Sequence, residues 1–265
     1  MTLRIERDGP VTTFIRDRSQ ARNAMDPASA EALTQALLDF DRDPAQSVGV
    51  LWGAGGAFCA GFDLKHAASQ LGEKNPMAAL DFPDDGPVPR GPMGPTRLQL
   101  SKPMIAAVAG PAVAGGMELA LWCDIRVMEE SAYMGVYCRR WGVPLIDGGT
   151  VRLPRIVGRG RALDIILTGR KVPADECLRI GLAERLVPHG KSRAAAEELA
   201  REIARFPQDC MRADRRSVWL QEGLSEMEGL RAEWACSSGM VEREGAAGAA
   251  RFAAGKGRHG DFGEI

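Results

Sequence analysis

The sequence lacks both clustered metal ligands and closely spaced cysteine pairs. Its six cysteines are widely spaced and form no C-x-x-C motif, and its three histidines are scattered along the chain. Metal centres in proteins need several such ligands brought together at short spacings, so no metal site is indicated. Single cysteines among apolar neighbours are typical of small core residues in a reducing compartment. We therefore expect a cytoplasmic protein without a metal site.

Long apolar runs and an excess of charge of one sign are also missing. No uncharged apolar stretch is long enough to span a bilayer, and the chain does not start with a charged segment followed by an apolar centre. The formal net charge is -1, and acidic and basic residues are mixed along the chain. This pattern indicates neither a nucleic-acid groove nor a polybasic membrane patch. We expect no nucleic-acid partner and no membrane association.

Three common site motifs are absent as well. Gly53 and Gly55 are followed by Phe58 at the position where a G-x-G-x-x-G fingerprint has its last glycine. Gly190-Lys191-Ser192 has Arg185 where a P-loop, G-x-x-x-x-G-K-[ST], requires its first glycine. The chain contains no G-x-S-x-G, which marks the nucleophile of many serine hydrolases. A dinucleotide-binding fold, a P-loop and a serine hydrolase are therefore disfavoured.

What is present suits one large α/β domain with an appendage: 265 residues, 45% hydrophobic and 26% charged. Asp8-Gly9 separates two β-like runs and predicts a hairpin over residues 2–16. Asp26-Pro27 followed by apolar residues at helical spacing predicts an amphipathic helix that ends before Asp43. A buried strand is predicted at 48–52.

Later segments extend this alternation of strands and helices. Short helices are predicted at 151–158, 160–168 and 173–180, and a strand at 182–187. From about Ser192 helical spacing dominates, with three or four helices and a glycine-rich tail. We therefore predict an α/β core over residues 1–190 and a C-terminal helical region over residues 191–265.

Residues 69–95 break the pattern of regular elements. The segment contains six prolines and four glycines, too many for a helix or a strand. A loop of this length inside a compact domain is usually a binding loop or disordered. We interpret it as a mobile lid over one side of a site, and the alternative is a solvated insertion without a role.

The central stretch, residues 102–128, reads KPMIAAVAGPAVAGGMELALWCDIRVM. An uncharged run at 104–109 predicts a strand, residues 110–116 predict a turn, and Glu118 follows within a short apolar helix. A carboxyl group in apolar surroundings has a pKa raised toward neutrality and can act as a general acid or base. The alternative is that Glu118 only complements the dipole of its helix.

Two glycine turns each follow a buried strand, and backbone N–H groups at such turns can point at one oxygen. The segments AFCAGFDL at 57–64 and KPMIAAVAGPAVAGGMELALWCDIRV at 102–127 resemble the crotonase superfamily, also called the enoyl-CoA hydratase/isomerase family. The resemblance continues through GGTVRLPRIVG at 148–158, LTGRKVPADECLRIGLAERLVP at 167–188 and the C-terminal FAAGKGR.

This resemblance implies a crotonase-like fold, an α/β spiral of ββα units that forms two roughly perpendicular sheets. The C-terminal helices would mediate a homotrimer, or a hexamer built as a dimer of trimers. The substrate would be an acyl-CoA thioester, so coenzyme A would enter as part of the substrate and no cofactor would be bound.

The resemblance also implies roles for single residues. The N–H groups of Ala60 and Gly115 would form an oxyanion hole for the thioester carbonyl, and Glu118 matches the first catalytic glutamate of the hydratases. Small residues suit the hole because the carbonyl must approach the backbone closely. Contacts to coenzyme A would come from the backbone near Arg22 to Ala24 and from Ala60 to Leu64, and also from the C-terminal segment of this or a neighbouring subunit. These expected contacts are Arg22, Ala24, Asp63, Leu64, Phe252 and Lys256.

The sequence departs from the hydratase pattern at Cys138. By the resemblance, hydratases carry a second glutamate at this position, and a thiol is a poor substitute for a carboxylic acid. Cys138 is interpreted as a packing residue, because no histidine is near it in sequence. Asp147 could supply the second carboxyl group, since its D-x-G-T setting resembles an aspartate position of dienoyl-CoA isomerases and its D-G-G resembles the 1,4-dihydroxy-2-naphthoyl-CoA synthases. Alternatively, Asp147 is a turn or N-cap residue.

Three functions therefore stay open at this point. The first is an enoyl-CoA hydratase, a lyase that adds water to trans-2-enoyl-CoA through an enolate stabilised by the oxyanion hole. The second is an enoyl-CoA or dienoyl-CoA isomerase that uses Glu118 and Asp147. The third is an acyl-CoA-binding protein with little turnover.

Overall fold

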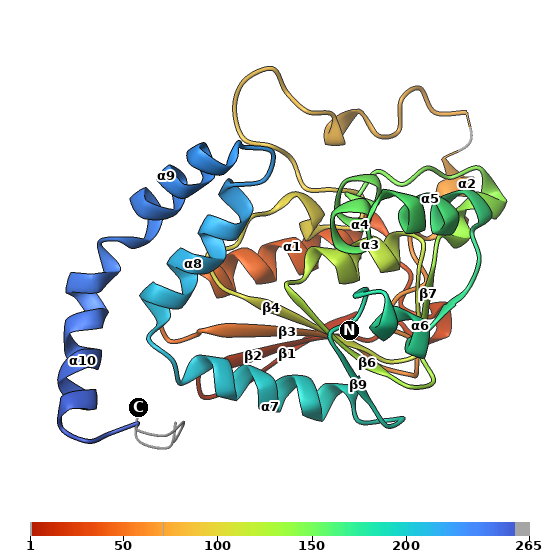
Figure 1. The fold of residues 1–265 in the computed structure, drawn as a ribbon. Helices are drawn as coiled ribbons and strands as arrows, with labels where there is room; N and C mark the ends of the chain where they lie inside the picture. The colour runs from red at the N-terminus through yellow and green to blue at the C-terminus, as the bar shows by residue number, and fades with distance from the viewer. Residues whose placement is uncertain (1, 71, 258–265) are drawn as a thin grey trace.

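The computed structural model describes residues 2–70 and 72–257, which form an α/β core flanked by helices (Figure 1). Part of the predicted glycine-rich tail, residues 258–265, lies outside this range. The first elements are β1 (Leu3–Asp8), β2 (Val11–Arg16), α1 (Pro27–Arg42), β3 (Val48–Gly53), α2 (Leu64–Ser69), β4 (Met104–Val108), β5 (Pro111–Val113), α3 (Gly115–Trp122) and β6 (Ile125–Glu129). The remaining ones are β7 (Tyr133–Gly135), α4 (Gly149–Val157), α5 (Arg159–Thr168), β8 (Val172–Pro173), α6 (Ala174–Arg179), β9 (Arg185–Val187), α7 (Ser192–Ala204), α8 (Gln208–Leu220), α9 (Glu226–Ser237) and α10 (Ala246–Ala253).

The larger sheet has six strands in the order β1-β2-β3-β4-β6-β9. β1 and β2 form the predicted antiparallel hairpin, and the other neighbours are parallel. Every residue of β4 is buried, and five of the six in β3 are. Parallel strands covered on both faces need apolar side chains on both faces, which explains the uncharged runs in the sequence.

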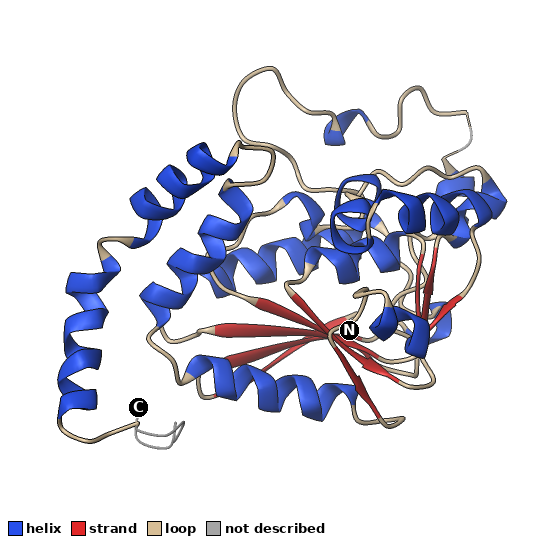
Figure 2. Ribbon diagram, viewed as in Figure 1, coloured by secondary structure: helices blue, strands red, loops and turns tan. Residues whose placement is uncertain are grey.

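Helices cover both faces of this sheet (Figure 2). On one face, Phe14, Leu51 and Ala106 belong to the main core cluster together with residues of α1 and α3. On the other face, the strand residues alternate with these and pack on α7, which holds Leu199 and Ala200. Because α7 completes the core, the helix that opens the predicted C-terminal region is part of the α/β layers.

Helix α1 confirms the sequence prediction at its start. The Asp26 side chain accepts a hydrogen bond from Ser29 N (2.8 Å), and Pro27 occupies the first helical position. This cap satisfies one of the free N–H groups of the first turn, and proline loses nothing there because its missing donor would be unpaired.

A second sheet of three strands, β5-β7-β8, runs across the direction of the first (Figure 2). The sequence predicted a turn at 110–116 and no strand near 133, yet β5 and β7 pair in parallel, with Ala112 opposite Met134. Strands of three residues are too short for a periodic signal. The second sheet is therefore visible only in the structure.

The loop expected over 69–95 starts after α2 and is exposed over much of its length. It arches above the helices that cover the larger sheet (Figure 1). Its end is different, because residues 91–96 are buried and lead into a 3₁₀ turn at Pro95–Arg97. The end of the loop thus belongs to the core.

The C-terminal helices α8 to α10 lie along one side of the core, with α9 and α10 projecting away from it (Figure 1). Large apolar side chains are exposed there, including Met227, Leu230 and Trp234. None of the helices in the described part of the chain has both the length and the apolar character needed to cross a membrane.

Two glycine substitutions test the close approach of the backbone at Gly110, directly before β5 of the second sheet, to the backbone at Gly56. Gly9 and Gly110 both have positive φ, 55° and 60°. A Cβ at Gly9 would meet nothing within 4 Å, whereas one at Gly110 would lie 2.0 Å from the carbonyl oxygen of Gly56. Gly9→Ala should lower the free energy of unfolding by about 1–2 kcal/mol. Gly110→Ala should lower it by about 1–3 kcal/mol more. Urea unfolding of both variants checks this, and equal losses would contradict the close approach.

Candidate active site

The two glycine turns meet at one end of the larger sheet. Cys59 pairs with the start of β5: its N–H donates to Pro111 O (3.0 Å), and its carbonyl accepts from Val113 N (3.0 Å). A Cβ on Gly61 would lie 3.2 Å from Gly115 N. The turn that follows β3 is therefore packed directly against the N-terminus of α3.

Small residues make this contact possible. A Cβ on Gly116 would lie 2.1 Å from Cys59 O, so no larger residue fits there without moving backbone. Ala114, which precedes α3, has φ 54° and ψ -128°, a strained conformation for a residue with a side chain. The N–H of Gly115 is in the first turn of α3, where it has no partner within the helix.

The prediction of Ala60 as an oxyanion donor needs correction. The Ala60 N–H donates to Arg22 O (3.0 Å), so it is already used. Phe62 is placed differently, because Met25 N donates to Gly61 O and Asp63 N donates to Met25 O, both at 2.8 Å. In such a parallel bridge, the N–H of Phe62, which lies between Gly61 and Asp63, points away from the segment that contains Met25.

The N–H of Phe62 accordingly has no acceptor among residues 2–70 and 72–257. It belongs to the peptide that follows Gly61, the residue packed on Gly115. The free donors at the junction of the two turns are therefore those of Phe62 and Gly115.

Glu118 lies in α3 and is 2% exposed. Its Oε1 accepts hydrogen bonds from Asp147 N (2.9 Å) and Gly149 N (2.8 Å). These donors belong to the segment before α4 and to its first residue. The carboxyl group therefore reaches across to another element, and complementing the dipole of its own helix does not account for its contacts.

The pKa of Glu118 is raised to about 7. Burial is the largest cause, and the charge of Asp147 raises the pKa further. The N–H groups of Gly149 and Asp147 and the charge of Arg152 oppose this rise. Near neutral pH the group is thus divided between its acid and base forms, which suits proton transfer.

Asp147 is buried as well, and its Oδ1 accepts hydrogen bonds from Met93 N (3.0 Å) and from the Thr96 hydroxyl. Burial raises its pKa, and the bonds from Thr96 and Met93 counteract that rise. The residue that precedes α4 is Gly148, and no side chain caps this helix. Asp147 is therefore not an N-cap, and it joins the end of the 69–95 loop to the site.

One cavity of about 120 Å³ brings the predicted residues together. It is lined by Glu118, Cys138 and Asp147, by Ala60 and Gly115 of the two turns, and by apolar and aromatic side chains. The apolar and aromatic residues include Phe62, Met93, Tyr137, Trp141, Val143 and Ile146. Cys138 is almost fully buried, and burial and then the Glu118 charge raise the pKa of its thiol. A neutral thiol at this position is in line with a packing role.

The expected contacts to coenzyme A fall into two groups. Arg22, Ala24, Asp63 and Leu64 lie together, because the 22–25 and 60–63 segments are hydrogen-bonded to each other. The Asp63 carboxylate already pairs with Arg18 (2.9 Å) and caps α2. Helix α10, which carries Phe252, lies on the opposite side of the chain from α2 (Figure 1). Phe252 and Lys256 therefore do not join the cavity of their own chain.

Sequence reasoning missed four residues at this site: Phe62, Met93, Thr96 and Arg152. Met93 and Thr96 lie at the end of a segment whose prolines and glycines show no periodic pattern. Arg152 lies within the GGTVRLPRIVG motif, which was a signal for the family but not for a role of this side chain.

Comparison with known proteins agrees with this geometry. The profile of the enoyl-CoA hydratase/isomerase family matches residues 10–253. Enoyl-CoA hydratase EchA19 of Mycobacterium tuberculosis is 36% identical over 234 residues, covering 86% of this chain and 84% of that protein. A carnitinyl-CoA dehydratase of Salmonella arizonae is 36% identical over 232 residues, covering 87% and 85%. A crystal structure of an enoyl-CoA hydratase from Mycobacterium tuberculosis superposes with a TM-score of 0.85 at 30% identity, covering 95% of both chains.

The chain thus belongs to the enoyl-CoA hydratase/isomerase family, the crotonase superfamily, and is an enzyme of that family with the crotonase fold.

The Glu118 pKa can be tested through stability. Its folded pKa of about 7 lies above the ordinary 4.5, so the stabilisation of the protonated form is complete below pH 4.5 and is lost as the pH rises through 7. The difference corresponds to roughly 3 kcal/mol. Urea unfolding from pH 4.5 to 8.5 should therefore show the wild type losing about 3 kcal/mol relative to Glu118→Gln. Parallel pH dependences of the two proteins would contradict the raised pKa.

Proposed function

We propose that this chain is an enoyl-CoA hydratase that adds water to trans-2-enoyl-CoA. The observation that carries the proposal is the buried Glu118 carboxyl group, with a pKa of about 7, at the same cavity as Gly115 and Phe62, whose N–H groups are free. The relatives named above support the proposal, because a hydratase adds water and a dehydratase catalyses the reverse reaction.

The two N–H groups would stabilise the charge that develops during the reaction. Water addition at the β-carbon moves negative charge onto the thioester oxygen and forms an enolate. Fixed donors aimed at that oxygen are each worth roughly 3 kcal/mol. This role is proposed for Phe62 and Gly115, because the N–H of Ala60 is bonded to Arg22.

Glu118 would move the protons. In its ionised form it takes a proton from water as the water oxygen bonds to the β-carbon. Delivery of that proton to the α-carbon, from Glu118 itself or through Asp147, completes the addition and restores the ionised form. The bonds from Asp147 N and Gly149 N hold Oε1, so Oε2 is the oxygen left for water. Asp147, the second buried carboxyl group at the cavity, would hold or return the proton.

The assembly and the remaining contacts to coenzyme A complete the proposal. The exposed apolar residues of α9 and its neighbours would be covered in a homotrimer or in a dimer of trimers. Phe252 and Lys256 would then contact the coenzyme A of a neighbouring subunit. Arg22, Ala24, Asp63 and Leu64 would contact that of their own chain.

Glu118→Gln should abolish most of the hydration of crotonyl-CoA. Removing a general base lowers kcat by about 10²–10⁴-fold, and the amide keeps the size of the side chain. The loss of enoyl absorbance measures the rate. Glu130→Gln, at an exposed glutamate outside the cavity, is the matched control and should retain wild-type activity. A Glu118→Gln variant with an unchanged rate would remove Glu118 from the mechanism.

An isomerase is the second candidate, favoured by the presence of Glu118 and Asp147 at one cavity where position 138 carries a neutral thiol. Moving a double bond needs removal of a proton from one carbon and delivery of a proton to another, by suitably placed bases, and no water. Asp147→Asn should then slow the conversion of 3-enoyl-CoA to 2-enoyl-CoA by about 10²-fold or more, measured by chromatography of the thioesters. A fully active Asp147→Asn variant would exclude this function.

A binding measurement distinguishes the two enzyme functions, hydratase and isomerase, from an acyl-CoA-binding protein. Calorimetry with crotonyl-CoA that shows tight binding, beside no product across a panel of thioesters, would favour the binding protein.

A further inference from the structure

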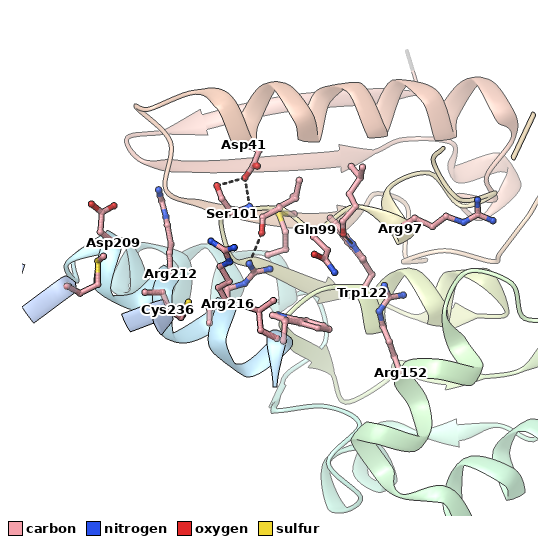
Figure 3. A pocket seen from close by; sticks show the side chains of 18 of the residues that line it. Asp41, Arg97, Gln99, Ser101, Trp122, Arg152, Asp209, Arg212, Arg216 and Cys236 are labelled. Carbon is pink, nitrogen blue, oxygen red and sulfur yellow. Dashed lines mark hydrogen bonds between the residues drawn. The ribbon is translucent and has the colours of Figure 1, made fainter. Parts of the chain in front are cut away.

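Arg152 lies between the candidate active site and a second, larger cavity. That cavity, of about 680 Å³, is bounded by residues of α8, α9 and the 97–104 segment (Figure 3). Six arginines line it: Arg97, Arg152, Arg212, Arg215, Arg216 and Arg243. Arg152 differs from the others because it also contacts the residues that hold the Asp147 carboxyl group.

The guanidinium of Arg152 joins two segments of the site. It donates through one nitrogen to Asp147 O (3.0 Å) and through the other to Thr96 O (2.7 Å). Thr96 and Asp147 are 51 positions apart and are already linked by the bond from the Thr96 hydroxyl to Asp147 Oδ1. The three residues therefore form a closed unit that fixes the Asp147 carboxyl group from both ends.

The hydrogen bonds of Arg152 within the described chain go to two carbonyl groups and to no carboxylate. Its positive charge is therefore not neutralised by a direct ion pair. The charged and titratable groups that act on it are Glu118 of α3, Cys123 directly after α3, Asp147 before α4 and Arg155 of α4 itself. Arg97, from the 3₁₀ turn, acts on Asp147 beside it.

This charge opposes the effect of burial on both carboxyl groups. Arg152 lowers the pKa of Glu118 and that of Asp147, whereas desolvation raises them. In a buried site such a charge is weakly screened by solvent, so its effect is larger than that of a surface arginine.

We propose that Arg152 is a positioning residue that holds the Thr96–Asp147 wall of the cavity through its two carbonyl contacts and places an unpaired positive charge beside the Glu118–Asp147 pair. The inference rests on the proposed function, because ionised Glu118 is the base of that reaction. Arginine suits both tasks, since its planar fork reaches two carbonyl oxygens at once and never loses its charge, whereas lysine supplies a point charge.

The test compares Arg152→Gln, which removes the charge, with Arg152→Lys, which keeps it. Arg155→Gln is the matched control, because Arg155 lies one turn along the same helix and pairs with Glu222 at the surface. The readout is kcat/KM for crotonyl-CoA against pH. In Arg152→Gln the pKa of Glu118 rises, so the acidic limb should move up by about 1 pH unit. Because Glu118 is about half ionised at pH 7 in the wild type, a pKa higher by about 1 unit should lower the rate at pH 7 by about 5-fold.

Arg152→Lys should leave the limb in place and lower kcat at nearly constant KM, because the charge stays while the two-carbonyl contact is lost. Arg155→Gln should match the wild type. An acidic limb that stays in place in Arg152→Gln would overturn the proposal and leave a purely structural role. If Arg152→Gln does not fold, Arg152→Lys provides the test: an acidic limb that is shifted from its wild-type position in this variant would also overturn the proposal.

A direct titration separates this inference from the proposed function. Carbon-13 NMR of glutamate-labelled protein follows the Glu118 carboxyl, which is assigned by its loss in Glu118→Gln. A wild type without activity on any enoyl thioester refutes the proposed function alone. An upward shift of the Glu118 titration in Arg152→Gln then still supports the role of Arg152, and an unchanged titration overturns it.

Discussion

The close approach of two backbone turns is the constraint on which this site depends. β3 and β4 are parallel neighbours, so the segments after them emerge at the same end of the sheet. Gly61 and Gly116 let these segments touch, since a Cβ on either would collide with the other turn. The contact brings the free N–H groups of Phe62 and Gly115 together, and it fixes the start of α3. That start sets the direction of Glu118, so the proposed catalytic carboxyl group and the proposed oxyanion donors are placed by a single contact.

The chemistry of Glu118 results from opposing effects of similar size. Full burial can raise the pKa of a carboxyl group by about 3–5 units, and a nearby positive charge lowers it by about 1–3. In this chain the balance gives a value of about 7, because two N–H donors and Arg152 offset only part of the effect of burial. Without these partners Glu118 would be protonated at neutral pH and could not accept a proton. With a closer ion pair it would be a weak base.

The sequence was sufficient to predict the layered core, but it predicted the residues of the site less completely. Uncharged runs and helical spacing predicted β3, β4, α1 and α3, because these are buried elements with a clear periodicity. Ala60 was assigned incorrectly, since the pairing of Met25 with Phe62 decides which N–H groups of the turn are free, and that pairing is a tertiary contact. Met93 and Thr96 reach the site from a segment without a pattern. β5 and β7 were too short to recognise.

Asp147 is the proposed replacement for the second carboxyl group, because it lines the same cavity as Glu118. By the family resemblance, position 138 carries a glutamate in hydratases, and here it carries a thiol that burial keeps neutral. Asp147 lines the same cavity, and the charges of the two carboxyl groups interact, since Asp147 raises the pKa of Glu118. Two buried carboxyl groups that repel each other are best stabilised when they share one proton. A pair with one proton would hold an acid and a base at once, which suits the proposed addition of water. In that proposal, the second carboxyl group comes from the segment that leads into α4.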